Sequence, residues 1–287
     1  MNNFVLLVLD SCRYDSFELI WSQLNCFPSL GNLEKAYSFA TWTLPSHVDF
    51  LAGRLPWKHS DKDPRFTRGG GRLHYEKVGE LKKWKSRLDI PENTIISDRY
   101  SIHDCLHKNG YKIKAITSAS PIGQDTMFSK LVDSHKSIGS KGDCLLRAKE
   151  ELDFSDLSFY IINLCETHYP YWIPGYDPDL EIKVISGLRG LARAAMENRN
   201  IEDVIFSSAE IKYLKERQQK SVSYLDSVLP QLLDKLPFNT SIVITADHGE
   251  AFGEGGYVGH GEVSHEIVLT VPFIEVSPNS LNSYLKR

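Results

Sequence analysis

The sequence predicts an α/β fold around a mostly parallel sheet, and three observations support this prediction. Continuous apolar runs at Phe4–Leu9, at Ser158–Leu164 and from Ser241 onward are typical of strands that a parallel sheet buries on both faces. Helical patterns lie between these runs, as the crossover connections of a parallel sheet require. No repeat, linker or low-complexity tract divides the 287 residues, so we expect a single domain, residues 1–287, with insertions.

The composition bounds the class of protein. With 41% hydrophobic and 24% charged residues the chain can bury a full core, and its net charge of −4 gives no general attraction to nucleic acid. Five cysteines, an odd number without a CxxC pair, indicate reduced structural thiols. The apolar run Phe4–Leu9 is too short for a signal peptide or a membrane span, so we expect a cytoplasmic protein.

In the N-terminal part, two short patterns place polar groups where ligands bind. The first strand stops at Asp10, and a turn into a helix follows, so Asp10 lies at a strand's carboxyl end. A short helix over about Pro45–Ala52 is expected, because proline suits a first turn and Gly53 suits the position past the end. Thr43 would then precede a helix N-terminus, where an anion is favoured. A threonine there is most often a cap, and as a nucleophile it would need a metal or a base.

A basic insertion is expected at about residues 58–91. Ten Lys and Arg residues and four Asp and Glu residues lie between Lys58 and Arg87, around the triple glycine 69–71. Such an insertion is either a solvated surface excursion or a lid over an anion site, and the sequence leaves both open. A helix within 91–109, entered near Ser97, and a strand at Tyr111–Thr117 follow it.

In the C-terminal half, the same strand-end pattern recurs twice. A helix is expected at Leu145–Leu152, and the strand Ser158–Leu164 then leads to Glu166 and His168. Residues 178–236 are predominantly helical, with an apolar core face formed by Val222, Leu225, Val228, Leu229, Leu232 and Leu233.

The strand from Ser241 ends abruptly in Asp247 and His248, and a glycine-rich loop then leads to His260. Carboxylates and imidazoles are common metal ligands, and the carboxyl ends of the strands are where α/β sheets bind their ligands. Glu250 is expected to orient a ligand or to close this loop. A last strand is expected at Ile267–Val276, with Pro272 at an edge or bend.

Several of these segments resemble motifs of one protein family, the sulfatase-like branch of the alkaline phosphatase superfamily. This branch includes sulfatases, phosphonate monoester hydrolases and phosphoethanolamine transferases. The resemblance is carried, in order, by LVLDSCRYD, ATWTLPSHVDFLAGRLPWKH, NLCETHYPY, SVSYLDSVLPQLLDKL and ITADHGEAFGEGGYVGHGEVSHEIVLTVPFI. It implies a doubly wound α/β sheet flanked by helices, with a C-terminal subdomain that is short or absent. It also implies metal-assisted attack by a side-chain nucleophile on phosphorus or sulfur.

The resemblance assigns roles by position. Asp10, Asp247 and His248 match the metal ligands, and Thr43 matches the nucleophile, which also contacts the metal. His260 matches a residue that binds the transferred group or a second metal. His168 is expected near the leaving group, and Arg13 and His47 are expected in substrate binding. Glu166, His168 and His260 together could form a second metal site.

Departures from the family pattern refine these expectations. Thr43 stands where typical sulfatases carry the Cys or Ser that is oxidised to formylglycine, so we expect no formylglycine and favour phosphate or phosphonate ester hydrolysis. Phosphoryl-group transfer, sulfate-ester hydrolysis and a non-catalytic role are the alternatives. Ser11 replaces a second aspartate, which favours Mn²⁺ or Zn²⁺ over Ca²⁺ or Mg²⁺, with one metal as the first choice. The expected partner is a small anionic ester, and a homo-oligomer is left open.

Overall fold

A mixed sheet forms the centre of the computed structural model, which describes residues 1–51, 57–58, 102–126, 128–175, 207–256, 258–261 and 265–286. Within these residues the strand order is β3-β2-β10-β7-β1-β6-β4-β5. The bounds are β1 Asn3–Leu9, β2 Glu34–Tyr37, β3 Trp57–Lys58, β4 Lys112–Thr117, β5 Ser134–Ser137, β6 Ser158–Leu164, β7 Thr240–Thr245 and β10 Thr270–Val276. Three predicted features lie outside the described residues: the basic insertion except for Lys58, the first half of the helix within 91–109, and residues 178–206 of the predominantly helical stretch.

The five strands from β7 to β5 are parallel, and β10, β2 and β3 add antiparallel pairs at the other side. Every residue of β1, β6 and β7 is buried. The continuous apolar runs are explained by this burial, since each large aliphatic or aromatic side chain contributes roughly 1.5–3 kcal/mol when fully buried. The expectation of a mostly parallel sheet is therefore confirmed.

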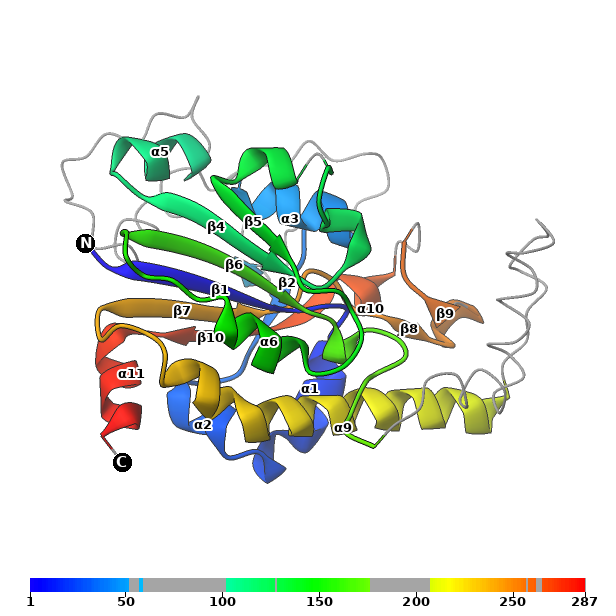
Figure 1. The fold of residues 1–287 in the computed structure, drawn as a ribbon. Helices are drawn as coiled ribbons and strands as arrows, with labels where there is room; N and C mark the ends of the chain where they lie inside the picture. Colours follow the sequence, from blue (N-terminus) through cyan, green and yellow to red (C-terminus); the bar gives the residue numbers. More distant parts are fainter. Residues whose placement is uncertain are drawn as a thin grey trace.

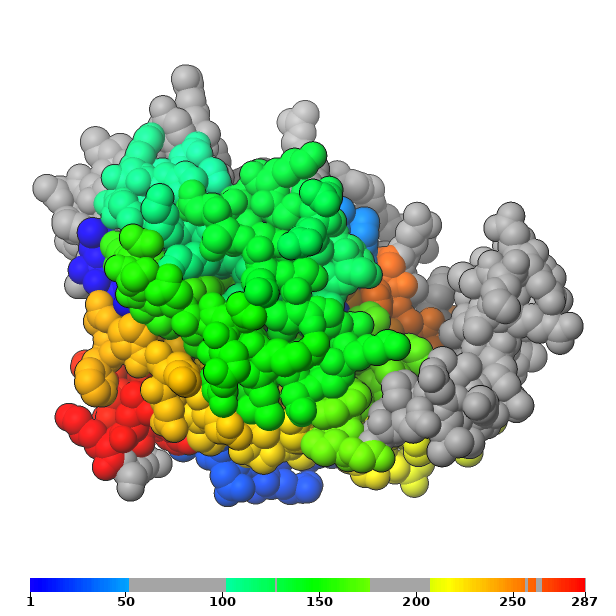
Figure 2. Space-filling model, viewed as in Figure 1, coloured from blue at the N-terminus to red at the C-terminus, as the bar shows by residue number. Residues whose placement is uncertain are grey.

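Helices cover both faces of the sheet, as a doubly wound fold requires (Figure 1). One face carries α1 (Tyr14–Ile20), α2 (Cys26–Leu30), α6 (Cys144–Glu150), α9 (Ser208–Leu233) and α11 (Pro278–Leu285). The other face carries α3 (Thr43–Leu51) and α5 (Ile102–Lys108). Figure 2 shows, in the same view, the segment 102–175 at the front of the molecule with α9 below it.

Shorter elements complete the described chain. A hairpin of β8 (Ala251–Phe252) and β9 (Val258–Gly259) follows β7, and α10 (Glu266–Leu269) precedes β10. The 3-10 helices are η1 Trp21–Gln23, η3 Ser120–Ile122, η4 Ser129–Leu131, η5 Cys165–Thr167 and η7 Glu254–Gly256.

The longest described helix, α9, packs its apolar stripe on the sheet layer. A capping box of Ser207 and Glu210 begins it, with the Ser207 hydroxyl accepting from the Glu210 N–H. All six residues of the apolar face expected within 178–236 are buried in this helix. Of the helices that the structure describes, none combines the length and the apolar composition that crossing a bilayer requires.

Three boundaries differ from the sequence expectations. Helix α3 begins at Thr43, two residues before Pro45. Proline is tolerated there because the N–H groups of a helix's first turn have no intrahelical partner, so the missing N–H of Pro45 costs no hydrogen bond. Residues 267–269 belong to α10, which His265 caps, so the last strand begins at Thr270. Pro272 lies in an interior strand and not at an edge, since β10 pairs with both β2 and β7.

Two polar strands were not expected. β5, with the sequence SHKS, is an edge strand with no apolar residue, and β2 (EKAY) buries only its last two residues. Neither gives the periodicity that marks a strand in sequence.

The carboxyl ends of the parallel strands all lie at one end of the sheet, beside α10 and the β8–β9 hairpin (Figure 1).

Candidate metal centre

Three side chains from the ends of β1 and β7 form a cluster that could hold a metal ion. Asp10 follows β1 directly, and Asp247 and His248 follow β7. One ligand atom from each of the three lies within 4.8 Å of the other two, and all three residues are fully buried. Among the described residues this is the group that satisfies such a geometry. The expectation that these residues converge is met because β1 and β7 are adjacent parallel strands.

Each carboxylate of the cluster has one oxygen engaged by the protein and one without a partner. The Oδ1 of Asp247 accepts from the backbone N–H groups of Ser11 and His248, both at 3.1 Å. The Oδ2 of Asp10 accepts from Asn163 at 2.9 Å. The other two oxygens, Asp10 Oδ1 and Asp247 Oδ2, are buried without a hydrogen-bond partner. Such orphaned buried oxygens are costly unless a cation satisfies them.

The imidazole of His248 faces those same two oxygens. Its Nδ1 donates to the Gly249 carbonyl at 2.9 Å, so its Nε2 carries the free lone pair. This Nε2 lies 3.5 Å from Asp247 Oδ2 and 3.9 Å from Asp10 Oδ1. Burial, followed by the charge of His260, lowers the pKa of His248 to about 3, so the ring is neutral and suited to bind a metal.

Burial disfavours the charged form of both carboxylates in the cluster. Burial, followed by the charge of Asp247, raises the pKa of Asp10. Burial also raises the pKa of Asp247, although the nearby His47 opposes it. The two unpartnered carboxylate oxygens and the imidazole nitrogen that converge here fit a divalent ion of the Zn²⁺ or Mn²⁺ type.

Glycine at 249 is required by close packing behind this cluster. A Cβ at Gly249 would lie 2.4 Å from the backbone oxygen of Ile267, a contact that real side chains do not make. The Gly249 N–H donates to Val268 O at 2.6 Å and so joins the strand end to α10. This contact fixes the position of the neighbouring His248.

Thr43 lies beside the cluster, as expected. It is the first residue of α3, is 4% exposed, and places its Oγ1 3.4 Å from His248 Nε2. The start of α3 is bound to the end of β7, because the hydroxyls of Ser46 (at 2.7 Å) and Ser38 both donate to the Asp247 carbonyl. The hydroxyl of Thr43 and the candidate metal ligands are therefore held in one rigid unit.

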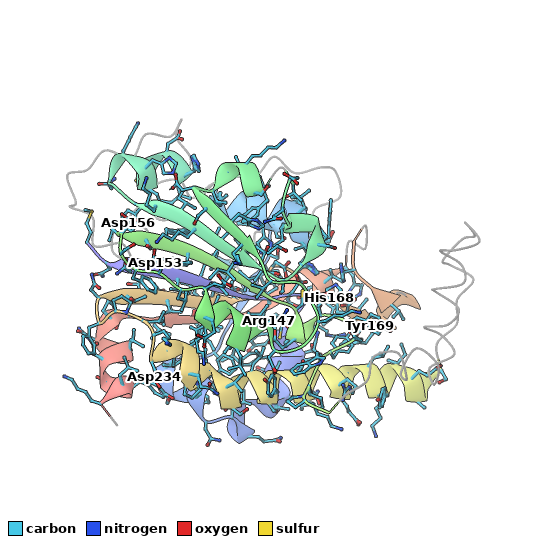
Figure 3. The ribbon with its side chains drawn as sticks, viewed as in Figure 1. Arg147, Asp153, Asp156, His168, Tyr169 and Asp234 are labelled. Carbon is cyan, nitrogen blue, oxygen red and sulfur yellow. The ribbon has the colours of Figure 1, made fainter. Side chains whose placement is uncertain are left out.

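Two further imidazoles, of His260 and His168, lie beside the cluster. The ring of His260 lies 4.3 Å from that of His248 and 5.2 Å from that of His168, measured between ring centroids. His260 Nδ1 donates to Glu250 Oε1 at 3.1 Å, and His168 Nδ1 donates to the Tyr169 carbonyl at 2.7 Å. His168 and Tyr169 lie at the same end of the sheet as the β8–β9 hairpin, and Asp153 and Asp156 lie at the other end (Figure 3).

The loop that carries His260 is attached to the loop that carries Thr43. The Gly261 N–H donates to Thr41 O at 3.0 Å, and the Thr41 hydroxyl donates to Gly261 O. Burial would lower the pKa of His260, but the charge and hydrogen bond of Glu250 raise it to about 9. Glu250 thus orients His260 and closes the loop, the two functions that the sequence left open for it.

The structure does not bring Glu166 into the cluster. Its Oε1 accepts from the Leu145 N–H at 2.8 Å, so this carboxylate binds the start of α6. Burial raises the pKa of Glu166 to about 7. The second metal site that the sequence suggested around Glu166 and His168 stays a prediction.

Arg13 and His47 also have structural partners. Arg13 is 1% exposed and binds Asp15 with two hydrogen bonds, of 2.7 and 2.8 Å, and Glu254 at 2.7 Å. His47 is fully buried, donates from Nδ1 to Thr43 O at 2.8 Å, and lies 3.8 Å from Asp247 Oδ2. The geometry favours anchoring roles for both residues over the substrate contacts that the sequence suggested.

One residue of the site was missed by sequence reasoning. Asn163 lies inside the apolar run of β6 and contacts Asp10. A polar residue within an otherwise apolar buried strand was the available signal, because such residues are buried only with a partner.

Comparison with known proteins supports one family. Residues 161–283 match the family model named Sulfatase. No curated protein matches the chain.

Solved structures with 14–17% sequence identity share the fold. The C-terminal periplasmic domain of EcEptC from Escherichia coli, in complex with Zn, is 16% identical with a TM-score of 0.53; the match covers 100% of this chain and 75% of that one. That of phosphoethanolamine transferase EptC from Campylobacter jejuni is 17% identical with a TM-score of 0.54, covering 98% and 81%. A 2-O GAG sulfatase is 16% identical with a TM-score of 0.54, covering 96% and 64%.

At these identities the structures show a common fold and nothing finer. The match extends over the whole chain, and the family model covers the part that includes β6, α9, β7 and β10. The family model therefore confirms the resemblance to the sulfatase family for residues 161–283, and the solved structures confirm the fold for the whole chain.

Proposed function

We propose that this chain is a metal-dependent hydrolase of phosphate or phosphonate esters with Thr43 as its nucleophile. One observation carries the proposal. The Oγ1 of Thr43 lies 3.4 Å from His248 Nε2, the same nitrogen that faces the unpartnered oxygens of Asp10 and Asp247. A binding module has no need of a hydroxyl held beside three metal ligands, so this arrangement favours catalysis.

The ligands of the ion would be Asp10 Oδ1, Asp247 Oδ2 and His248 Nε2, and we propose one Zn²⁺ or Mn²⁺. When bound, such an ion supplies positive charge that lowers the pKa of the Thr43 hydroxyl and offsets charge on the ester oxygens. Of the structures similar to this chain, the Escherichia coli domain was solved in complex with Zn.

The residues of the chain account for the remaining steps. The Thr43 hydroxyl releases its proton to solvent, and its oxygen forms a bond to phosphorus as the bond to the leaving alcohol breaks, which gives a phosphothreonine. The backbone N–H groups of Thr43 and Leu44, at the start of α3, would donate to the non-bridging oxygens. His260, which Glu250 orients, or His168 donates a proton to the leaving oxygen and later takes one from the water that cleaves the phosphothreonine.

Phosphorus is preferred to sulfur as the reacting centre because Thr43 cannot be oxidised to the formylglycine of typical sulfatases. The substrate would be a small anionic ester. Transfer to an alcohol acceptor is the second candidate, because two of the similar structures are domains of EptC proteins, one of them named as a phosphoethanolamine transferase. In that case an alcohol, in place of water, cleaves the phosphothreonine.

The test is a panel of aryl phosphate monoesters, diesters, phosphonates and sulfates, each with Zn²⁺ or Mn²⁺, on wild type and Thr43→Ala. We expect Thr43→Ala to lower kcat/KM for a phosphate or phosphonate ester by about 1,000-fold or more, with Zn²⁺ affinity retained. Thr43→Ser keeps the hydroxyl and serves as the matched control.

Two outcomes would contradict the proposal. Equal turnover by wild type and Thr43→Ala would show that Thr43 is not the nucleophile. Faster turnover of sulfate esters than of phosphate esters would show that the enzyme is a sulfatase. Adding an alcohol acceptor distinguishes transfer from hydrolysis, because a transferase forms the phosphorylated alcohol in preference to inorganic phosphate.

A further inference from the structure

Asn163 is buried beside the proposed metal centre and is not one of its ligands. It is the penultimate residue of β6, has no exposed surface, and donates from Nδ2 to Asp10 Oδ2 at 2.9 Å. β6 is the strand next to β1, with Asn163 level with Val8, so its side chain reaches the residue that follows β1. The contact therefore depends on the register of two central strands.

The amide of Asn163 can take only one orientation. Its Oδ1 accepts from the Ala119 N–H at 3.0 Å, and the Ser118 hydroxyl oxygen lies 3.3 Å from it. A backbone N–H can only donate, so the oxygen of the amide must face Ala119 and the nitrogen must face Asp10. The Asn163 backbone is held in the same place, because its carbonyl accepts from the Ser118 N–H at 3.2 Å and from the Ser118 hydroxyl at 2.8 Å.

This orientation decides which oxygen of Asp10 remains free. The donor from Asn163 engages Oδ2, and the Cys165 Sγ lies 3.9 Å from that same oxygen. The other oxygen, Oδ1, has no partner and is the one that lies 3.9 Å from His248 Nε2. Because the two oxygens of a carboxylate are equivalent, the bond to Asn163 fixes the plane of the group. Turning this plane would break the bond to Asn163 and move the free oxygen away from His248 Nε2.

We propose that Asn163 is a positioning residue for the metal ion: it fixes the Asp10 carboxylate so that Oδ1 faces the ion, and Ser118 and Ala119 at the end of β4 fix Asn163 in turn. The inference rests on the proposed metal site and extends it to a third and a fourth strand of the sheet. Hydrogen bonds of this kind orient metal ligands, and their loss typically costs 10- to 100-fold in metal affinity.

The test measures Zn²⁺ affinity by competition with a chromogenic chelator, on Asn163→Ala and on Asn163→Leu. Leucine has nearly the shape of asparagine but neither donor nor acceptor, so it preserves packing and carries the test if the alanine variant fails to fold. We expect both variants to bind Zn²⁺ roughly 10- to 100-fold more weakly than wild type.

Asn3→Ala is the matched control, since Asn3 is a buried asparagine at the opposite end of the same pair of strands. It donates to Asn239 Oδ1 at 3.3 Å and accepts from the Ser158 N–H at 2.8 Å. A variant at Asn3 should lower the melting temperature and leave Zn²⁺ affinity unchanged. A purely structural role of Asn163 would give this same result.

Zn²⁺ affinity equal to wild type in the folded Asn163→Leu protein would overturn the inference, and so would an equal loss in Asn3→Ala. Failure of the proposed function is distinguishable from these outcomes. A wild-type protein that binds Zn²⁺ and loses affinity on substitution of Asn163, yet cleaves no phosphate ester, supports this inference and rejects only the proposed reaction.

Discussion

At the scale of single residues, the pair of Glu250 and His260 controls the geometry next to the candidate metal ligands. Burial would raise the pKa of Glu250, but the charge and hydrogen bond of His260 lower it, and Glu250 in turn raises the pKa of His260. The pair is thus a mutually stabilised ion pair, 3.1 Å between Oε1 and Nδ1. Because the Nδ1 proton of His260 is engaged, the ring turns its other side toward His248 and His168.

Substitution of Glu250 tests this arrangement. We expect Glu250→Ala to lower kcat for a phosphate ester by about 100-fold, because His260 loses the acceptor that orients it and proton transfer is worth about that much. Zn²⁺ affinity should change little, since Glu250 is not one of the three candidate ligands. Steady-state kinetics and chelator competition give the two readouts.

Glu250→Gln is the comparison variant, because its side-chain oxygen can still accept from His260 Nδ1. It should retain more activity than Glu250→Ala. If Glu250→Ala had the wild-type kcat, the role of Glu250 in orienting His260 would be rejected.

At the scale of elements, Arg13 connects three segments around the site. It precedes α1, binds Asp15 in α1 and Glu254 in the hairpin loop, and lies with its guanidinium 5.0 Å from the ring centroid of Phe252. Lys215 of α9 binds Asp15 at 2.7 Å. The small apolar cluster of Tyr171, Leu214 and Phe252 packs in the same region. The charged group therefore anchors the hairpin that leads to His260.

The pH dependence of stability follows from this anchor. Burial would raise the pKa values of Asp15 and Glu254, but the hydrogen bonds and charge of Arg13 lower both below their ordinary values of 3.8 and 4.5. A carboxyl whose pKa is lowered by folding stabilises the protein above its unfolded pKa and loses this contribution as the pH falls through its folded pKa. The stabilisation is thus present at neutral pH and is lost in acid.

We expect Arg13→Ala to lower the free energy of unfolding by roughly 2 kcal/mol at neutral pH, and by less at pH of about 3. Urea denaturation of wild type and variant at both pH values measures the two differences. Lys212→Ala is a control, since Lys212 pairs with Glu216 on the exposed face of α9 and should show a small effect at either pH. An Arg13→Ala difference that does not shrink in acid would contradict the ion-pair account.

At the scale of the whole molecule, the candidate metal centre joins distant parts of the chain. Its candidate ligands follow β1 and β7, with Asp10 and Asp247 lying 237 residues apart in the chain, and the proposed nucleophile Thr43 begins α3. The same strand ends bear the hydrogen bonds that connect α3 and α10 to the sheet. An ion at this point would link the first and last parts of the fold.

Metal binding should therefore stabilise the folded protein. At a free Zn²⁺ concentration of 100 times the dissociation constant, we expect a gain of roughly 2.7 kcal/mol, and removal of metal by a chelator should lower the melting temperature by roughly 5 °C or more. Differential scanning calorimetry with and without Zn²⁺ measures the shift. Asp247→Asn keeps the shape of the ligand and should abolish most of the shift. An equal melting temperature of wild type with and without Zn²⁺ would contradict a metal centre at this site.

Much of the fold and of the site could be predicted from sequence because local signals carry it. The apolar runs of β1, β6 and β7 reflect burial on both faces, and the apolar stripe of α9 reflects its packing face. Asp10, Asp247 and His248 are found at strand ends because polar residues stop an apolar run, and parallel strands place their ends at one edge. Thr43 was located in a similar way, from the proline that indicates a helix start just after it.

Only the tertiary structure decided which polar residues serve that site. The sequence cannot show that Glu166 binds the start of α6, that Arg13 is engaged by Asp15 and Glu254, or that Asn163 reaches Asp10. Each outcome depends on partners far apart in the chain and on strand register, which local patterns do not encode. Sequence therefore determined where the ligands of the centre lie, and the packing of β6 and β4 against β1 determined how one of them is oriented.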